Sequence, residues 1–415
     1  MKRIVISLLL LTVISLGGST IAAGPSTSMN IAPESGSYEA ITSQTYTTRD
    51  LIEIYNNGEM EAMAITEGWD GDGSAEHPYV ITGYRLTATH TQPIRIWNVD
   101  LHWEFVDNII EWGAVCGTYF AGCENGLIAN NTFHGRHSGM VVQNCENLII
   151  RNNIVDNNTA NGIEIFQGSV NLTIESNKIS DSAEAGIYVP FSNDFIIADN
   201  EISNSGTSGI AVVGLIDSLI TENIVTGSTE HGIYLYSLQD SRVTHNTVED
   251  SGIYGVYMSL GAQNIFSKNW IENSTSFGAS LGIQCTNATF WGNVLIDNGV
   301  DCQACDNGTD NVFAYTYFDD WTSPDDNSDG YVDLPYVIAG TAANEDPYPR
   351  TGIGVDVPCR LATTTTSATT SSTTTTTTTT TTTDLPMVPI LELSVAVGAV
   401  AAIVLIVILV KRRSA

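Results

Sequence analysis

Short apolar stretches recur along the middle of the chain at a nearly constant interval. Aligned on one asparagine per interval, successive asparagines are 22 to 24 residues apart, and the residues three before and two after each asparagine are apolar. These asparagines are Asn108, Asn131, Asn153, Asn177, Asn200, Asn223, Asn246, Asn269 and Asn293. A glycine column from Gly117 to Gly278 keeps the same period. A fixed period of this size is typical of solenoids, in which each repeat buries its apolar residues against its neighbours.

The spacing within each interval predicts strands. Apolar residues alternate with polar ones in short runs, with Asn, Ser and Gly between the runs, which is the pattern of β-strands joined by tight turns. An interval of about 23 residues gives a coil with three faces, and stacked coils place equivalent residues about 4.8 Å apart. We therefore expect an all-β fold, a right-handed parallel β-helix of about ten coils over residues 79–318, with Thr316 in the last coil. The asparagines should stack as a ladder, and Ile197 should lie directly over Ile220.

The glycine column predicts a second corner of each coil. Glycine is needed where the backbone adopts a positive φ or where another chain segment approaches closely. The sequence leaves both explanations open.

The segments on either side of the repeats have other patterns. In residues 49–65 apolar residues recur at near-helical spacing, which predicts a short helix covering the first coil, within an N-terminal segment and cap of residues 24–78. Residues 319–351 follow the last coil and contain an Asp-rich stretch, so we expect a C-terminal cap there. Residues 352–390 are rich in Thr and cannot build a core, which predicts an extended, O-glycosylated stalk.

The two ends of the chain predict export and a membrane anchor. Residues 1–23 combine two basic residues, an apolar run and small residues, the design of a signal peptide. Residues 391–410 are long and apolar enough for one transmembrane helix, and the basic residues of the tail, 411–415, favour a cytoplasmic location for it. We expect a single-pass protein of the cell membrane with its N-terminal domain outside.

Charge narrows the choice of partners. The chain has 46 acidic residues against 15 Lys and Arg, a net charge of −31. Such a surface disfavours nucleic acid and anionic lipid and suits divalent cations, salty surroundings or plain solubility. Together with the predicted location, this leaves extracellular glycans or surface proteins as expected partners. Six N-x-[ST] sequons are compatible with a glycoprotein.

Three stretches carry a family resemblance. The coils, the segment GWDGDGSAEHPYVITGY (68–84) and the segment DDWTSPDDNSDGYVDLPYVIAGTAANEDPYPRT (319–351) resemble the right-handed parallel β-helix repeats of surface and periplasmic proteins, including the NosD type and pectate-lyase-like proteins. The resemblance implies the fold. It does not imply one activity, because this framework carries lyases, hydrolases, epimerases and inert binders. NosD-type proteins are linked to copper-site maturation, but the column of soft ligands that copper(I) would need is missing here.

The stretch DDNSDGYVD resembles a calcium-binding loop in its spacing of oxygen donors. The donors would be Asp325, Asn327, Asp329, Asp333 and the carbonyl group of Tyr331. Position 12 of the loop is Tyr336, so the bidentate Glu of an EF-hand is absent. A structural calcium ion is one interpretation, and an Asx-rich turn that closes the last coil is the other.

Cysteines are expected to stabilise the coils. Cys123 and Cys145 each lie eight residues before a ladder asparagine, so they occupy one column on adjacent coils. An extracellular location permits disulfides, and adjacent coils are close enough for this pair to be bridged. A second bridge is expected among the cysteines near residue 300.

Two outward columns offer candidate sites. Two residues after the column glycines come Tyr188, Tyr234 and Tyr257, which would form an exposed aromatic strip suited to stacked sugar rings, and Glu164, which could accept hydrogen bonds from sugar hydroxyl groups. The alternative is that tyrosine is there only because it suits strands. One residue before the ladder asparagines come Asp199, Glu222 and His245. Stacked carboxylates at this spacing are a weak candidate for the acid pair of a glycosidase.

Three functions remain open from the sequence. The leading hypothesis is a non-catalytic cell-surface protein that binds glycans or has an adhesive or surface-layer role. The first alternative is a membrane-tethered polysaccharide lyase or glycoside hydrolase. The second is a purely structural rod that associates side by side through an outward apolar column that includes Ile149, Ile196, Leu219 and Ile265.

Overall fold

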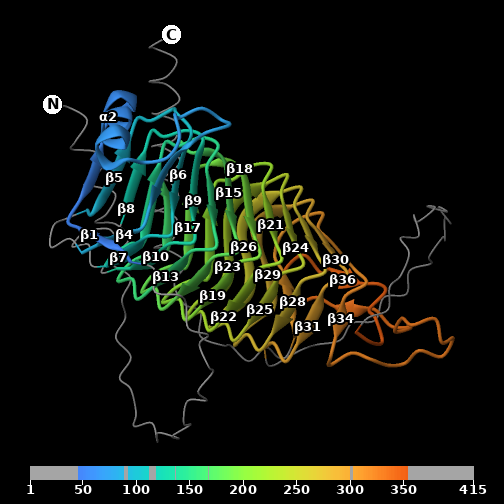
Figure 1. The fold of residues 1–415 in the computed structure, drawn as a ribbon. Helices are drawn as coiled ribbons and strands as arrows, with labels where there is room; N and C mark the ends of the chain where they lie inside the picture. The colour runs from blue at the N-terminus through green and yellow to red at the C-terminus, as the bar shows by residue number, and fades with distance from the viewer. Residues whose placement is uncertain are drawn as a thin grey trace, which may run out of the picture. The chain divides into compact units, whose positions relative to one another are not determined.

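The computed structural model describes residues 45–353, apart from 88–91, 112–117, 136, 167 and 300–301. Within these residues the chain forms the expected right-handed parallel β-helix of about ten coils (Figure 1). The predicted signal peptide, transmembrane helix and tail lie outside the described residues, as does the predicted stalk beyond residue 353. The described part contains no helix with the length and hydropathy of a membrane span.

Three parallel sheets surround a common core, because each coil contributes one short strand to each sheet. In the described residues the first sheet has 12 strands, which in order are β1 (Thr47–Arg49), β4 (Tyr84–Leu86), β7 (Ile109–Glu111), β10 (Thr132–His134), β13 (Ile154–Asp156), β16 (Lys178–Ser180), β19 (Glu201–Ser203), β22 (Ile224–Thr226), β25 (Thr247–Glu249), β28 (Trp270–Glu272), β31 (Val294–Ile296) and β34 (Tyr317–Phe318).

The second and third sheets each have 11 strands within the same residues. The second consists of β2 (Ile52–Ile54), β5 (Ile94–Trp97), β8 (Thr118–Ala121), β11 (Met140–Gln143), β14 (Ile163–Phe166), β17 (Ile187–Pro190), β20 (Ile210–Val213), β23 (His231–Gln239), β26 (Tyr254–Ala262), β29 (Ala279–Thr286) and β32 (Ala304–Asp306). The third consists of β3 (Tyr79–Thr82), β6 (Trp103–Val106), β9 (Gly126–Ala129), β12 (Ile149–Arg151), β15 (Val170–Glu175), β18 (Asn193–Ala198), β21 (Leu219–Thr221), β24 (Arg242–Thr244), β27 (Ile265–Ser267), β30 (Thr289–Trp291) and β33 (Val312–Ala314).

The core consists of the apolar columns that the sequence predicts. Ile197 in β18 pairs with Ile220 in β21, so the expected stacking is confirmed. The residues three before and two after every ladder asparagine are at most 1% exposed. Each coil therefore buries its Ile, Val and Phe side chains against the coils above and below it, which is why the repeat must recur.

The asparagine ladder is also confirmed. From Asn108 to Asn269, the backbone N–H of each ladder residue donates to the side-chain oxygen of the next asparagine at 2.9–3.1 Å. The side-chain amide of each also donates to a main-chain carbonyl of the preceding coil, as Asn223 does to Ile197 at 2.9 Å. These buried polar groups are satisfied by one another, so the column adds hydrogen bonds without leaving unpaired groups.

The structure decides between the two explanations of the glycine column in favour of close approach. Glycines of this column such as Gly209 and Gly232 have no positive φ. A Cβ atom on Gly209 would lie 2.2 Å from a methyl carbon of Val225, and one on Gly232 would lie 2.1 Å from a methyl carbon of Val248. The column is glycine because a core side chain of the next coil, such as Val225 for Gly209, occupies the space of a Cβ atom.

The two ends of the β-helix are covered differently (Figure 1). At the first coil lies α2 (Asn57–Glu67), with Asn56 as N-cap, Gly68 as C-cap, and Met60 and Ala64 buried. The helix begins later than expected, because β1 and β2 already pair with β4 and β5 within the segment predicted as cap. Their alternating burial explains the difference, since Ile52 and Ile54 point into the core.

The last coil is covered by the C-terminal segment. Its strands β35 (Tyr336–Val337) and β36 (Glu345–Asp346) pair antiparallel, and Tyr336 stacks on Phe318 with ring centroids 3.7 Å apart. Thr316 lies in the tenth coil as predicted, where its backbone N–H donates to the carboxylate of Asp346 at 2.9 Å. Asp346 thus replaces the asparagine that the ladder would need next.

The predicted disulfide between Cys123 and Cys145 is not seen, and the cysteines near residue 300 are also free thiols in the described chain. Cys123 and Cys145 do lie on adjacent coils, with the Cys123 N–H donating to the Cys145 sulfur at 3.4 Å. Each thiol instead donates to main-chain carbonyls, including that of Ile96 at 3.0 Å for Cys123. Contact with Cys145 and burial raise the pKa of the Cys123 thiol, which keeps it protonated and unreactive.

Candidate functional site

The outer side of the second sheet gathers most of the predicted ligand-binding residues. Tyr188, Tyr234 and Tyr257 occupy one outward column, in which Ala211 separates Tyr188 from Tyr234. Glu164 lies beside Tyr188 in the same column. We call the outer side of β14, β17, β20, β23, β26 and β29 the aromatic face. The sequence predicted an exposed strip, but these side chains are half-buried.

The rings are half-buried because further aromatic residues pack beside them. His231 and Tyr254 are paired in register in a second outward column, three residues before Tyr234 and Tyr257. The His231 and Tyr254 rings are nearly parallel, at 4° and 5.2 Å, and Tyr254 lies 5.1 Å from Tyr257. Phe277 continues this column, with its ring 6.0 Å from that of Tyr254.

Sequence reasoning missed this second aromatic column. The signal was present, because His231, Tyr254 and Phe277 directly precede column glycines in three successive repeats.

The phenol of Tyr234 and the imidazole of His231 are uncharged at neutral pH. Burial raises the pKa of Tyr234 to about 12 and lowers the pKa of His231 to about 4. The Nδ1 atom of His231 is buried and has no hydrogen-bond partner among the described residues. The five rings therefore offer apolar faces together with neutral hydroxyl and imidazole groups, which is the chemistry of a surface for amphipathic ligands.

Glu164 brings a carboxylate to one end of the aromatic face. The hydroxyl of Ser138 donates to its Oε2 atom at 2.5 Å. Burial raises the pKa of Glu164, and Glu184 nearby raises it further, while the hydrogen bonds from Ser138 and Asn161 lower it. The side chain is held in place by these bonds and retains oxygen atoms that can accept hydrogen bonds.

The weak catalytic candidates Asp199, Glu222 and His245 lie outside this face. They occupy successive coils, as predicted, at the corner between the third and first sheets, and all three are exposed. Each has a positive φ of 54–58°, the left-handed conformation that the corner requires. These residues lie at an exposed corner of the backbone and not in a desolvated site, so their positions add no support to the catalytic interpretation.

The predicted calcium ligands lie together in one turn. The oxygens of Asp325 accept from the backbone N–H groups of Asp329 and Gly330 at 3.1 and 3.2 Å, and the side-chain oxygen of Asn327 accepts from Asp329 at 2.8 Å. Asp333 accepts from the N–H of Asp326, and the Tyr331 N–H donates to Asp329. The arrangement is an Asx-rich turn that closes on itself, and calcium binding there stays a prediction.

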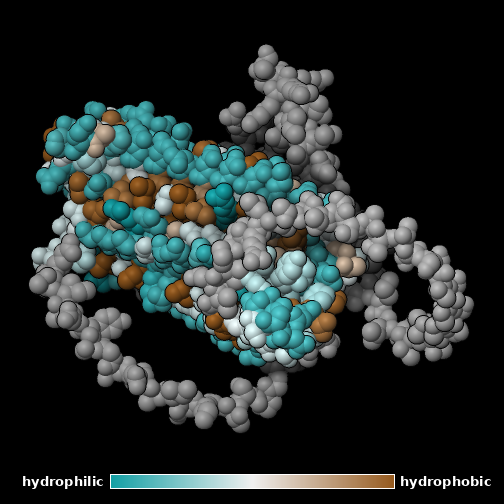
Figure 2. All heavy atoms as spheres, turned by 90° about the vertical axis from the view of Figure 1, so that its right-hand side faces the viewer, coloured by the Kyte–Doolittle hydropathy of each residue, from teal (hydrophilic) through white to brown (hydrophobic). Residues whose placement is uncertain are grey.

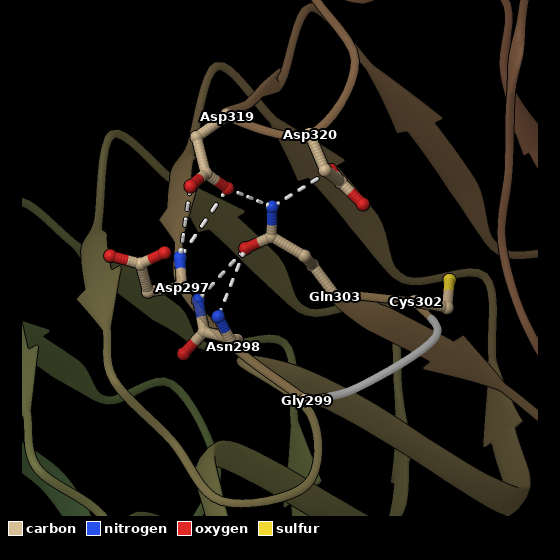
Figure 3. A pocket seen from close by; sticks show the side chains of 7 residues that line it. All are labelled: Asp297, Asn298, Gly299, Cys302, Gln303, Asp319 and Asp320. Atoms are coloured by element: carbon tan, nitrogen blue, oxygen red, sulfur yellow. Dashed lines mark hydrogen bonds between the residues drawn. The ribbon is translucent and has the colours of Figure 1, made fainter.

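Two cavities near the C-terminal end are lined by acidic residues. One, of about 360 Å³, is lined by Glu249, Asp250, Glu272, Asn273 and Asp297. The other, of about 230 Å³, has Gln303 at its centre (Figure 3). The Gln303 side chain donates to Asp319 and Asp320 and accepts from Asn298 at 3.1 Å. These groups satisfy one another and close the last coils.

The third sheet carries an exposed apolar column, as predicted for side-by-side association. Ile149, Ile196 and Ile265 are 40%, 41% and 38% exposed, and Ile196 pairs with Leu219 on the next coil. Parallel stacking places like residues in rows, and the face drawn in Figure 2 shows a band of apolar residues bordered by hydrophilic ones. The prediction that this column points outward is confirmed by its exposure.

Two family models match the chain. One is described as periplasmic copper-binding protein (NosD) and matches residues 166–337; the other is described as right handed beta helix region and matches residues 92–214. The resemblance stated from the sequence is thereby confirmed. Among the described residues, no group of three or more His, Cys, Asp or Glu side chains could hold a metal ion.

Solved structures of low identity are similar to this chain over part of its length. The Dettilon tailspike protein (gp208) is 15% identical, with 62% of this chain and 57% of that chain covered and a TM-score of 0.49. The periplasmic alginate epimerase AlgG is 12% identical, with coverages of 63% and 84% and a TM-score of 0.40. PfbA, a surface adhesin of Streptococcus pneumoniae, is 12% identical, with coverages of 59% and 75% and a TM-score of 0.36. No curated protein matches the chain.

Proposed function

We propose that this chain is a non-catalytic glycan-binding protein displayed outside the cell, and that the aromatic face is its binding surface. The observation that carries the proposal is the contiguous set of five rings, His231, Tyr234, Tyr254, Tyr257 and Phe277, on the outside of one sheet. Sugar rings present flat C–H surfaces and hydroxyl groups at their edges, and tyrosine matches both.

The scaffold supports this function because it holds the rings in fixed positions. Tyr234, His231, Tyr254 and Tyr257 stand on β23 and β26, which are hydrogen-bonded to neighbouring strands on both sides, and Phe277 directly precedes the corner glycine before β29. Equivalent positions repeat about every 4.8 Å along the coils, so a polymer lying along the axis meets a new side chain at each coil. A rigid, repeating surface loses little conformational entropy on binding.

The proposed location rests on the sequence. A signal peptide, a Thr-rich stalk and one transmembrane helix would place the β-helix outside a cell membrane. The description of the matching NosD family as periplasmic supports a location outside the cytoplasm.

Affinity electrophoresis of the full chain through gels that contain polysaccharides tests the proposal. We expect at least one polymer to retard the protein, and Tyr234→Ala with Tyr257→Ala to weaken that retardation roughly tenfold to a hundredfold, because each ring contributes about 1 kcal/mol. Tyr317→Ala is the matched control, since Tyr317 is an equally half-buried outward tyrosine on the first sheet. Retardation unchanged by the double substitution would refute the aromatic face as the site.

A second candidate function, lateral association of copies, is favoured by the exposed apolar column of the third sheet. Ile149, Ile196 and Ile265 lie on a surface that a solitary soluble domain ordinarily covers with polar residues. This function uses a different sheet and is compatible with glycan binding by the second.

A further inference from the structure

The charges around the aromatic face are all of one sign among the described residues that surround it. Glu184 and Glu230 stand exposed in the turns before β17 and β23, and Glu164 lies on the face itself. Both glutamates of the turns lie near enough to tyrosines of the face to affect them, Glu184 at Tyr188 and Glu230 at Tyr234. The site therefore has a negative potential beside Tyr188 and Tyr234.

No compensating cation lies on this face in the part of the chain that the structure describes. Between the first residue of β14 and the last of β29, the Lys and Arg side chains are those of Lys178, Arg242 and Lys268. Lys178 is on the first sheet, Arg242 is on the third, and Lys268 is at the corner between those sheets. Arg95 belongs to the second sheet but lies in β5 and is paired with Glu53 at 2.6 Å.

The histidines of the region do not reverse this charge. Burial lowers the pKa of His231 and keeps it neutral. The exposed His137 lies close enough to Glu164 to interact with its charge, so it would be attracted to Glu164 before it could attract an anionic ligand. The whole molecule adds to the effect, since its net charge is −31.

These charges decide which class of glycan the face accepts. A carboxylate or sulfate group laid against Glu164 and Glu184 would meet like charges, which disfavours its binding. Hydroxyl groups meet no such penalty, because carboxylate, phenol and imidazole groups all accept or exchange hydrogen bonds with them. We propose that the aromatic face selects neutral polysaccharides and rejects uronate-containing or sulfated ones.

This inference rests on the proposed glycan binding, and its test separates the two. The full chain is run in affinity gels containing a neutral glucan, a neutral mannan, polygalacturonate or a sulfated galactan. We expect retardation by a neutral polymer that Tyr234→Ala with Tyr257→Ala removes, and none by the two acidic polymers. Added NaCl should not weaken the retardation, because an uncharged ligand has no charge to screen.

A charge-neutralising variant gives the positive test. Glu164→Gln combined with Glu184→Gln keeps the shape of both side chains and removes both charges, so polygalacturonate should retard this variant, whereas it should not retard the unchanged protein or the Tyr317→Ala control. Retardation of the unchanged protein by an acidic polymer, lost in the tyrosine double variant, would overturn the neutral class and leave glycan binding standing. Retardation by no polymer of either kind would overturn both.

Discussion

At the scale of single residues, the most informative position of the repeat is the ladder asparagine. Asn223 shows the full set of contacts. Its side-chain oxygen accepts from the backbone and side chain of Asn200 at 3.1 and 2.9 Å, and its amide donates to Ile197 and to Asn246, both at 2.9 Å. Replacing it removes the partner of several buried groups at once, which is more harmful than removing one exposed bond.

We expect Asn223→Ala to lower the free energy of unfolding by about 2–4 kcal/mol, because it leaves the Asn200 N–H and the Ile197 carbonyl buried and unpaired. Asn204→Gly is the matched control. Asn204 is exposed, at a corner with φ 55°, and the change should stay within about 0.5 kcal/mol. Urea denaturation followed by circular dichroism measures both, and equal losses would show that the ladder is not a source of stability.

The sequence was sufficient for the ladder and the core, because both are fixed by residues of one kind at one interval, such as Ile197 and Ile220. It was not sufficient for the corners. Asp199, Glu222 and His245 share a left-handed backbone conformation that the sequence did not predict, since non-glycine residues in general rarely adopt it. Their outward direction was predicted correctly. The catalytic interpretation considered only the acid and base groups of their side chains and missed the backbone conformation that places these residues at a corner.

At the scale of elements, the candidate site was only half predictable. Tyr188, Tyr234 and Tyr257 follow from the repeat, because outward positions alternate with core positions along a strand. The contribution of His231, Tyr254 and Phe277 depends on how side chains pack across strands. In addition, β23 and β26 have nine residues each, whereas earlier strands of this sheet such as β17 and β20 have four. Tertiary packing therefore adds what the period alone leaves open.

The Asp-rich turn is an element whose cation remains to be tested. We expect calcium at millimolar concentration to raise the Tm of the full chain by about 2–4 °C, equivalent to about 1 kcal/mol of binding free energy. Asp325→Asn with Asp329→Asn should abolish the shift, because hard oxygen ligands would be lost. Asp310→Asn, at an exposed corner elsewhere, is the control. If calcium does not change the Tm, the turn is an ordinary Asx-rich connection without a bound calcium ion.

At the scale of the whole molecule, two properties oppose each other. The exposed Ile149, Ile196 and Ile265 favour contact between copies, while a net charge of −31 on each copy opposes it. Salt changes only the second term, because the Debye length falls from about 10 Å at 0.1 M to about 3 Å at 1 M.

We therefore expect the full chain to sediment as a monomer at 0.05 M NaCl and to form dimers as NaCl approaches 1 M, about the concentration at which charges only a few ångströms apart are screened. Replacing Ile149, Ile196 and Ile265 by Thr should keep it monomeric at high salt. The same change at Ile154 and Ile224, which are 46% and 50% exposed on the first sheet, should not. Monomers at every salt concentration would remove association from the possible functions.

The buried carboxylate of Asp346 terminates the hydrogen-bonded ladder at the last coil. Asn223 shows that a ladder asparagine accepts hydrogen bonds from the preceding coil and donates hydrogen bonds to both neighbouring coils. A further asparagine at the end of the ladder would still have donor groups that need an acceptor on another coil. The carboxylate of Asp346 accepts hydrogen bonds from the N–H groups of Tyr315, Thr316 and Tyr348. A carboxylate has no N–H group to donate to a further coil. Asp346 thus satisfies the last open N–H groups of the final coil, and a chain cut before residue 346 would leave the N–H groups of Tyr315 and Thr316 without this acceptor at an exposed end of the β-helix.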